Sequence, residues 1–530
     1  MRYSYPCALI FAAGLLWLAM NAIAFAQAPA AAQFDEHTPI LQRRVSLNAE
    51  GVTLHSVLED LCRQAGAEFR CDFQALAYTN LNPAKLVPVA IDDDTLQDAF
   101  ARLIDSGPRS GVGYRAEGKV VRLATWKALH QWDRKHVPQW IAAVRGVSAR
   151  VDLAGDVYEV YAGGAAITDQ LAARIATLPR LRKLDLSRCE NLTKKGLSRL
   201  VKTAHLEELD ISGADDLGDA VLHELRGHPS LRSIRISECG TTDEGIRGLH
   251  ELPNLRELSL YQEGRLTDAA LEMIAELTHL RSLSLTSYVS TQEYGWMRFS
   301  PDAMNKLSAL RELEVLNLSG NPFPADALPL PHLRVLAMSG ENIDDRIGER
   351  LAQCANLQAL KFESTQIGDE TLRAIAGLKR LNHLTIDGGR VTDDGLRHLA
   401  DMRRLEYLQL RRLPISNAGM AHVAEIKSLT RIDLIGGGKG PLNAAGLSLL
   451  KDLPHLRTLW LMGYDDPAGF AGLKALTQLR ELHFDMCSLN EEQFHSLEAA
   501  LPDTGIMAGH GGGWLRSSRN AIDQPGILTN

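Results

Sequence analysis

The chain has 530 residues, of which 45% are hydrophobic and 23% are charged. This balance is typical of a folded protein with a large buried core, and it excludes a disordered chain. The formal net charge is -8. Because nucleic-acid-binding proteins usually carry a basic surface, this charge argues against a nucleic-acid partner.

Residues 1–26 have the pattern of a secretory signal peptide. Arg2 precedes an apolar run from about residue 8 to residue 20, and the small residues Ala24 and Ala26 predict cleavage after Ala26. The alternative is an N-terminal membrane anchor, although the run is short for a hydrocarbon core of roughly 30 Å. We therefore expect an exported bacterial protein, periplasmic or secreted, with no transmembrane segment after cleavage.

Six cysteines follow the expected cleavage site, which is too few for a disulfide-based scaffold in a chain of this length. Cys62 and Cys71 lie close together in one small domain, so a disulfide between them and two separate thiols both remain open. No Cys/His cluster has the spacing of a zinc site. The sequence thus predicts no metal and no cofactor.

Residues 42–125 predict a small α+β domain made of two βαβ halves. Its helices begin near Thr53 and Thr95, and the spacing Thr-Leu-x-x-Val/Ala-Leu/Phe resembles the short N-terminal domain of secretins and TonB-dependent receptors. That resemblance implies a periplasmic docking module, and an unrelated α+β domain is the alternative. Residues 126–150 contain three tryptophans, Trp126, Trp132 and Trp140, and we expect this segment to cap the first unit of the region that follows.

From residue 151 to residue 508 the pattern Leu-x-x-Leu-x-Leu returns about every 25 residues, a period typical of a solenoid. The alternation in LRKLDL or LEYLQL predicts a short strand whose leucines point inward. The first leucines of the thirteen units are Leu181, Leu206, Leu231, Leu255, Leu280, Leu313, Leu333, Leu357, Leu381, Leu405, Leu429, Leu456 and Leu479.

Each strand is followed by a helical segment such as VTDDGLRHLADM at 391–402. The Thr suits a helix N-cap, the next Asp complements the helix dipole, and apolar residues recur at helical spacing. One unit cannot bury its leucines alone. Neighbouring units should therefore stack, with parallel strands on a concave face and the wider helices on a convex face.

These units resemble the leucine-rich repeat family. The T-D-x-x-L signature, with Cys189, Cys239 and Cys487 three residues beyond the strand, is similar to the cysteine-containing, ribonuclease-inhibitor-like subclass. Asn321 occupies the same position, so we interpret these cysteines as buried repeat residues. The resemblance implies an α/β horseshoe preceded by the small α+β domain.

Two departures from the period stand out. The step from Leu280 to Leu313 is long, and the next step is short and rich in proline, which disfavours a helix. The insertion is either a binding edge or a local change of helix type that alters curvature. Its aromatic residues are Tyr288, Tyr294, Trp296 and Phe299. Residues 509–530 are rich in glycine and are expected to form a flexible tail.

No catalytic constellation is visible. The chain has neither a phosphate-binding P-loop nor an HExxH zinc motif. Carboxylates such as Asp169, Asp369 and Asp393 recur with the period, so we interpret them as helix-start residues rather than acid–base pairs. The protein is therefore predicted not to be an enzyme.

The outward-facing strand positions are the expected site of function. In the last units apolar, aromatic and basic side chains converge there, a composition typical of interface hot spots. The predicted patch consists of Tyr407, Arg411, Arg431, Ile435, Trp460, Met462 and His483. We expect a protein or peptide partner on this face, unless the C-terminal tail covers it. The alternative function is that of a secreted effector that recruits host ubiquitin machinery through its repeats.

Overall fold

The computed structural model of the chain describes residues 43–71, 86–103, 112–117, 120–125, 133, 135–151, 156–164, 167–189, 191–214, 217–287, 299–321, 330–436, 442–464, 469–487, 489–510 and 513–516. The signal peptide predicted at residues 1–26 lies outside this range, as do Tyr288, Tyr294 and Trp296. Within the described part, no helix is long and apolar enough to cross a membrane. The chain divides into two compact units, Met1–Ser284 with Thr291–Gly295, and Leu285–Ser290 with Trp296–Asn530.

The N-terminal part of the first unit contains both strands and helices. Its elements are β1 (Arg44–Thr53), α2 (Leu54–Gln64), β2 (Glu68–Cys71), β3 (Leu86–Thr95), α4 (Leu96–Leu103), β4 (Val112–Glu117) and β5 (Val120–Thr125). Strand β1 pairs with β3, and β5 lies between β2 and β4. The two βαβ halves are therefore not separate sheets, because each sheet takes strands from both halves.

The apolar stripes of α2 and α4 form the core of this part, with Leu61 and Phe100 fully buried between them and the strands. Cys62 lies in that core and Cys71 lies on β2, and both are thiols in the structure.

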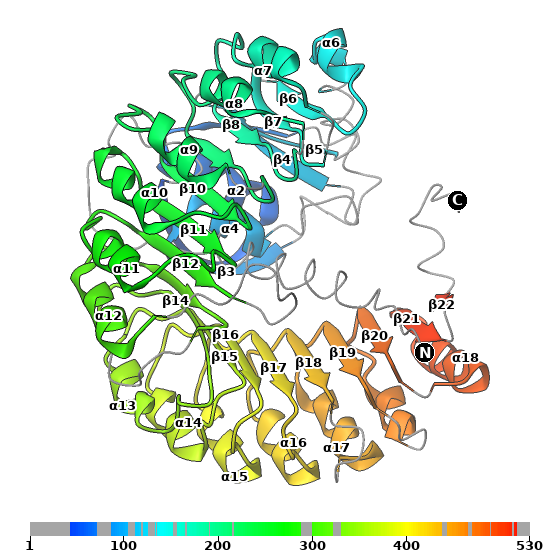
Figure 1. Ribbon diagram of the computed structural model, residues 1–530. Coiled ribbons are helices and arrows are strands. Elements are labelled where there is room, and N and C mark those ends of the chain that lie inside the picture. The colour runs from blue at the N-terminus through cyan, green and yellow to red at the C-terminus, as the bar shows by residue number, and fades with distance from the viewer. Residues whose placement is uncertain are drawn as a thin grey trace, which may run out of the picture. The chain divides into compact units, whose positions relative to one another are not determined.

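The repeats of the first unit form a continuous ladder of short strands. Strand β6 (Ser148–Val151) pairs antiparallel with β7 (Val157–Tyr161), and the strands that follow are parallel. These are β8 (Lys183–Asp185), β9 (Glu208–Asp210), β10 (Ser233–Ser237) and β11 (Glu257–Tyr261). The helices between them are α7 (Asp169–Ile175), α8 (Lys194–Leu200), α9 (Gly218–Glu224) and α10 (Asp243–Arg247), with α11 (Asp268–Ala275) after β11 (Figure 1). Strand β12 (Ser282–Thr286) lies where the two units divide.

The segment before the first repeat packs against the first repeat helix. Helix α6 (Gln139–Ala142) carries Trp140, and the Arg174 guanidinium of α7 lies 4.4 Å from the centre of the Trp140 ring. This contact agrees with a capping role for Trp140, whereas Trp126 and Trp132 lie outside the described residues.

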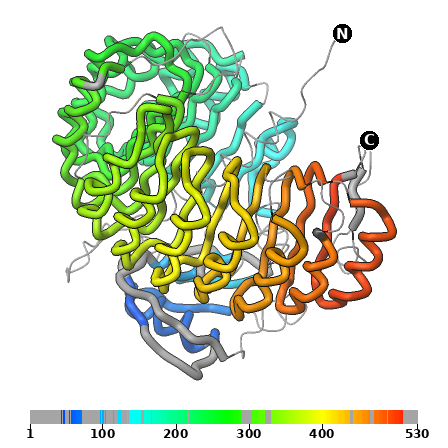
Figure 2. The backbone as a smooth tube through the Cα atoms, turned by 90° about the horizontal axis from the view of Figure 1, so that it is seen from below, coloured from blue at the N-terminus to red at the C-terminus, as the bar shows by residue number. Residues whose placement is uncertain are grey.

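The second unit continues with parallel strands, whose successive turns Figure 2 shows as a stack. The strands are β13 (Val315–Leu318), β14 (Val335–Ser339), β15 (Ala359–Glu363), β16 (His383–Asp387), β17 (Tyr407–Arg411), β18 (Arg431–Ile435), β19 (Thr458–Met462), β20 (Glu481–Asp485) and β21 (Gly505–His510). The helices are α12 (Pro301–Asn305), α13 (Ile347–Ala352), α14 (Asp369–Ile375), α15 (Asp393–Leu396), α16 (Asn417–Val423), α17 (Ala444–Ser448) and α18 (Glu491–Ala500). A 3₁₀ helix, η6 (Gly469–Ala475), takes the place of an α-helix after β19.

The C-terminus differs from the expected flexible tail. Gly509 and His510 belong to β21, and β22 (Gly513–Arg516) pairs antiparallel with β21. The extra strand satisfies backbone groups that the last parallel strand would otherwise leave at the sheet edge.

Inward leucines hold the repeats together, as the period predicts. Leu381, Leu405 and Leu429 are fully buried. The strand register pairs residue 384 with 408 and residue 408 with 432, so equivalent side chains stack from one repeat to the next. This confirms that the repeats form a leucine-rich solenoid with a parallel sheet.

The cysteines beyond the strands are buried repeat residues. The Cys239 thiol donates to the carbonyl oxygen of Ile211 in the preceding repeat at 3.0 Å, and burial raises its pKa to about 12. Asn321 makes the equivalent bond to Leu285 at 2.7 Å. The preceding residue has a positive φ in each case, 54° at Glu238 and 82° at Gly320. The sharp turn after the strand therefore directs this side chain back under the previous repeat.

The recurring aspartates also join neighbouring repeats. Asp369, at the start of α14, accepts bonds from the Thr392 amide at 2.8 Å and the Thr392 hydroxyl at 2.7 Å. Asp169, Asp219, Asp243 and Asp393 make the same pair of bonds to the next repeat. The sequence interpretation of helix-start residues is thus confirmed, and each carboxylate also satisfies the helix N-terminus of its neighbour.

Phe299, the one described aromatic residue of the insertion set, is 5% exposed and precedes the N-cap of α12. It therefore packs inside the solenoid and does not belong to an exposed edge.

Candidate protein-binding surface

Strands β17 to β20 present three outward positions each, which alternate with the buried leucines. Their parallel register aligns these positions into rows that cross the four strands. The rows are Tyr407, Arg431, Thr458 and Glu481; Gln409, Asp433, Trp460 and His483; and Arg411, Ile435, Met462 and Asp485. All seven residues of the predicted patch lie in these rows, so the structure brings them onto one sheet face.

Arg431 lies on β18, at the first outward position of the strand. Its guanidinium carbon is 5.3 Å from the centre of the Tyr407 ring and 5.7 Å from that of Trp460, so it contacts an aromatic side chain on each neighbouring strand. Its Nε and Nη2 donate to the two carboxylate oxygens of Asp433 at 2.8 and 2.9 Å. This two-pronged bond fixes the plane of the guanidinium before any partner arrives.

Asp433 is the buried acceptor of the cluster, with 1% of its surface exposed. Its Oδ2 also accepts a bond from the Tyr407 hydroxyl at 2.8 Å and a longer one from Gln409 at 3.5 Å. Each carboxylate oxygen thus accepts at least one hydrogen bond, and Oδ2 accepts three. The patch predicted from the sequence did not include Asp433 and Gln409. Both lie two residues from members of the patch, so strand alternation places them on the same face.

Tyr407 is more buried than an outward strand position suggests. It is 6% exposed, and burial raises the pKa of its phenol well above the ordinary value, with a further increase from the Asp433 carboxylate. Met462 is 7% exposed. The expectation of an exposed apolar cluster is therefore wrong for these two residues.

Trp460 has a polar atom without a partner. The side chain is half-buried and its ring centre lies 5.8 Å from that of His483, yet the indole Nε1–H has no hydrogen-bond acceptor among the described residues. A buried donor without an acceptor costs about 1–3 kcal/mol.

Arg411 takes part in a neighbouring charged group. Its Nη1 lies 3.1 Å from Asp387 Oδ2, and Arg412 Nε donates to Asp387 Oδ1 at 2.6 Å. Asp387 is 3% exposed, so two arginines share one buried carboxylate.

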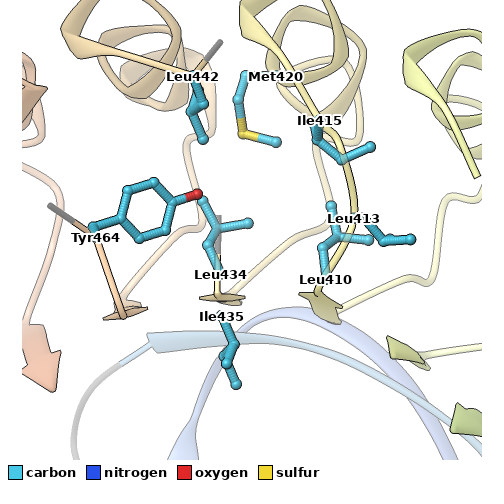
Figure 3. Close-up of a pocket in the computed structure, with 8 residues that line it drawn as sticks. All are labelled: Leu410, Leu413, Ile415, Met420, Leu434, Ile435, Leu442 and Tyr464. Carbon is cyan, nitrogen blue, oxygen red and sulfur yellow. The ribbon is translucent and has the colours of Figure 1, made fainter. Parts of the chain in front are cut away.

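Ile435 separates the sheet face from an apolar gap between repeats. Figure 3 shows Leu434 directed toward the helices and Ile435 directed to the opposite side of the strand. The gap is lined by Leu410, Leu413, Ile415, Met420, Leu434, Ile435, Leu442 and Tyr464. With seven aliphatic or thioether side chains around it, this gap belongs to the core rather than to a site for a polar ligand.

The corresponding face of the first unit is dominated by acidic and small side chains. Arg235 Nη1 lies 3.1 Å from Asp210 Oδ2 on the adjacent strand, and its neighbour on the other side is Ser259. Arg235 is therefore ion-paired like Arg431, although its carboxylate partner lies on the adjacent strand and is held through one nitrogen. Across the described residues of both units, no group of three His, Cys, Asp or Glu side chains could hold a metal ion.

Comparisons with known proteins agree with the repeat fold. A family model described as a leucine-rich repeat matches residues 178–201. A Trypanosoma equiperdum protein, named as an adenylate cyclase regulatory protein, is 42% identical over 86 residues. The match spans 16% of this chain and 13% of the trypanosome protein.

Three solved structures resemble the chain at low identity. An internalin from Listeria monocytogenes is 21% identical, with 67% of this chain and 86% of the internalin covered and a TM-score of 0.39. A leucine-rich repeat protein from Leptospira interrogans is 17% identical, with 64% and 98% covered and a TM-score of 0.34. The plant peptide hormone receptor RGFR1 in complex with RGF2 is also 17% identical, with 64% and 53% covered and a TM-score of 0.34.

Proposed function

We propose that this leucine-rich repeat scaffold binds a protein partner through the outward face of strands β17 to β20. One observation carries the proposal: Arg431 is held between Tyr407 and Trp460 and fixed by Asp433. Arginine and tryptophan are the residues that most often dominate protein interfaces. A side chain that is already ordered loses little conformational entropy on binding.

The repeats supply the rigid support that such a site needs. Each strand is fixed on both sides by its neighbours, so the rows keep their spacing when a partner binds. The recurring residues maintain the stack, and the outward positions are the ones that differ between repeats. Recognition is therefore the role that this architecture supports best, without a catalytic step.

We extend the proposal to location and subclass. Export rests on the signal-peptide pattern of residues 1–26, and docking in the bacterial periplasm rests on the likeness of residues 42–125 to the secretin short N-terminal domain. The conserved role of Cys189, Cys239 and Cys487, each donating to the preceding repeat, supports the cysteine-containing subclass. Detection of a mature N-terminus at Gln27 in the envelope or medium would test export.

The binding experiment compares capture by three forms of the chain. The immobilised protein is incubated with the envelope fraction of its source cells, and the retained proteins are identified by mass spectrometry. We expect Trp460→Ala to lose a protein that the unmodified chain retains, because the substitution removes the aromatic surface beside Arg431. Arg235→Gln is the control, because it removes an ion-paired arginine from an outward strand position of the first unit.

The amount of captured protein retained by each form decides the outcome. Equal retention by the unmodified chain and Trp460→Ala would remove β17 to β20 as the binding face. A version without residues 42–125 tests docking separately: it should keep the partner and lose envelope association.

A further inference from the structure

The connections that lead into strands β16 to β20 are basic. Each connects the end of one helix to the start of the next strand, and they span residues 376–382, 400–406, 424–430, 453–457 and 476–480. Together they contain seven Lys or Arg residues and three acids, Asp401, Glu406 and Glu425, which gives a net charge of +4 in a chain whose net charge is -8. We call these five connections the basic edge.

Four side chains of the basic edge are exposed and carry uncompensated charge. None of the four forms an ion pair or a side-chain hydrogen bond with another described residue. They are Lys379, Arg403, Arg404 and Arg480. Lys427 donates to two neutral acceptors, the carbonyl oxygens of Ala424 and Asp452, at 2.7 and 3.1 Å. The positive potential of this edge is therefore available to an anionic partner.

Arg457 and Arg480 bring like charges together on this edge. Each directly follows the first leucine of its strand motif, so they are equivalent residues of neighbouring repeats. Arg457 Nη1 donates to the carbonyl oxygens of Pro454 and Leu456, at 3.1 and 2.9 Å. Burial and the Arg480 guanidinium together lower the pKa of Arg457. An anion beside the two arginines would reduce this repulsion.

The corresponding connections of the first unit are also basic, but four of their cations are paired. Arg180 lies 3.2 Å from Asp156, and Arg182 lies 3.8 Å from Glu207. Two further cations lie 2.9 and 3.7 Å from a carboxylate. Helix C-termini favour nearby cations, which accounts for basic residues at this position of the repeat. It does not account for the lack of acid partners before β16 to β20.

The strand register makes the basic edge level. Residue 383 pairs with 407, 407 with 431, 431 with 458 and 458 with 481, so β16 to β20 begin side by side (Figure 1). At about 4.8 Å between strands, their starts form a row about 19 Å long. All residues of the basic edge are described, and none is an exposed large apolar side chain of the kind that anchors a protein partner. A level row of charges without an apolar anchor fits a flat anionic surface.

We propose that the basic edge contacts the headgroup layer of an anionic lipid membrane. Clusters of four to eight basic residues bind such surfaces through the lipid phosphates. A net charge of +4 gives half-binding at about 1 mM lipid in low salt. This contact is weak, so it orients a chain that other contacts hold. The outward face of β17 to β20 is a different surface of the sheet and stays open to the protein partner.

Co-sedimentation with lipid vesicles tests the proposal. The chain is used without residues 1–26, because the apolar run of the predicted signal peptide would itself insert into lipid. Phosphatidylcholine vesicles with about one-third phosphatidylglycerol are compared with phosphatidylcholine alone. We expect at least about tenfold weaker binding to the neutral vesicles, and release from the anionic ones at about 0.5 M salt. Glycerol phosphate should release no more chain than sodium chloride of equal ionic strength.

Substitutions define the surface that is responsible. Arg403→Gln combined with Arg404→Gln should weaken binding to anionic vesicles at least about fivefold. Arg180→Gln combined with Arg182→Gln removes the same charge from ion-paired positions of the first unit, and should change binding less than about twofold. Asp401→Asn removes an exposed acid of the basic edge and should tighten binding by about twofold or more, a gain that does not depend on the folding of the other variants.

Each alternative has its own result. Equal binding to both kinds of vesicle, no binding to anionic vesicles in low salt, or equal weakening by the two double variants would overturn the proposal. Specific release by glycerol phosphate would assign the edge to a free phosphate compound, and binding to polyglutamate but not to vesicles would assign it to an acidic protein; both also overturn it. The proposed function is tested separately, because Trp460→Ala should leave vesicle binding unchanged.

Discussion

Gly395→Ala should break one of the links between neighbouring repeats. Gly395 follows the N-cap of α15 by three residues, and a Cβ at this position would lie 2.1 Å from Asp369 Oδ1 and 3.2 Å from the Asp369 Cα. The Asp369 carboxylate would have to leave its place. Its two bonds to the Thr392 amide and hydroxyl would then be lost.

The size of the effect follows from those two bonds. Hydrogen bonds to charged groups contribute about 1.5–3 kcal/mol each, and these are solvent-exposed, so we take the lower value and a loss of about 3 kcal/mol. Alanine is favoured over glycine in a helix by about 1 kcal/mol, which offsets part of the loss. The net destabilisation should be about 2 kcal/mol.

Hydrogen exchange at the Thr392 amide measures this directly, and about 2 kcal/mol corresponds to roughly 30-fold faster local exchange. Gly377→Ala is the matched control, because a Cβ there meets no atom within 4 Å. It should be neutral or slightly stabilising.

A double-mutant cycle identifies the cause of the destabilisation. In an Asp369→Ala background the added methyl group meets no carboxylate, so Gly395→Ala should no longer destabilise. Additive effects of the two substitutions would refute the steric explanation. A destabilising Gly377→Ala would show that any added methyl group near this repeat is harmful.

Three further predictions concern titratable groups. The hydroxyl and amide of Thr193 hold the pKa of Asp169 below its ordinary value. The ionised Asp169 therefore stabilises the folded chain above about pH 4, and this stabilisation is lost as the pH falls through the lowered pKa. Thr193→Val should raise the pKa of Asp169 in an NMR titration, and an unchanged pKa would contradict the link. Burial lowers the pKa of His228, which is 6% exposed, so the folded chain binds the His228 proton less tightly than the unfolded chain. The stability of the fold should therefore fall on acidification below about pH 6.5. His228→Gln should reduce the dependence of the unfolding temperature on pH between about pH 7.5 and 5.5. With its pKa raised to about 12, Cys239 should resist alkylation by iodoacetamide at pH 8 until the chain unfolds, and rapid labelling of the folded protein would disprove its burial.

The repeat architecture was predictable because it depends on local patterns that recur. Each leucine in a strand and each Thr-Asp pair at a helix start carries the same information in every unit, so errors in single positions do not alter the result. The burial of Cys239 could also be anticipated, because Asn321 occupies the equivalent position. The second role of Asp369, as a link to the next repeat, depends on a distance between repeats that no single unit contains.

The patch was predictable in its membership and not in its chemistry. Strand alternation places Tyr407 and Trp460 on the outward face, and the period aligns their strands. It does not show that Tyr407 is buried, or that Asp433 binds the Tyr407 hydroxyl and Arg431 together and so orders the arginine. Those bonds depend on rotamers and on packing across three strands.

The sequence by itself determined the period, the direction of the leucines and the identity of the repeated helix starts, because these follow from short-range geometry repeated many times. Only the tertiary structure decided which polar atoms are satisfied and which are left without a partner. Hydrogen bonding between strands depends on register and on angstrom-scale distances between side chains that are some 25 residues apart in the chain. The indole N–H of Trp460, which is buried without a hydrogen-bond acceptor among the described residues, is visible at that level alone.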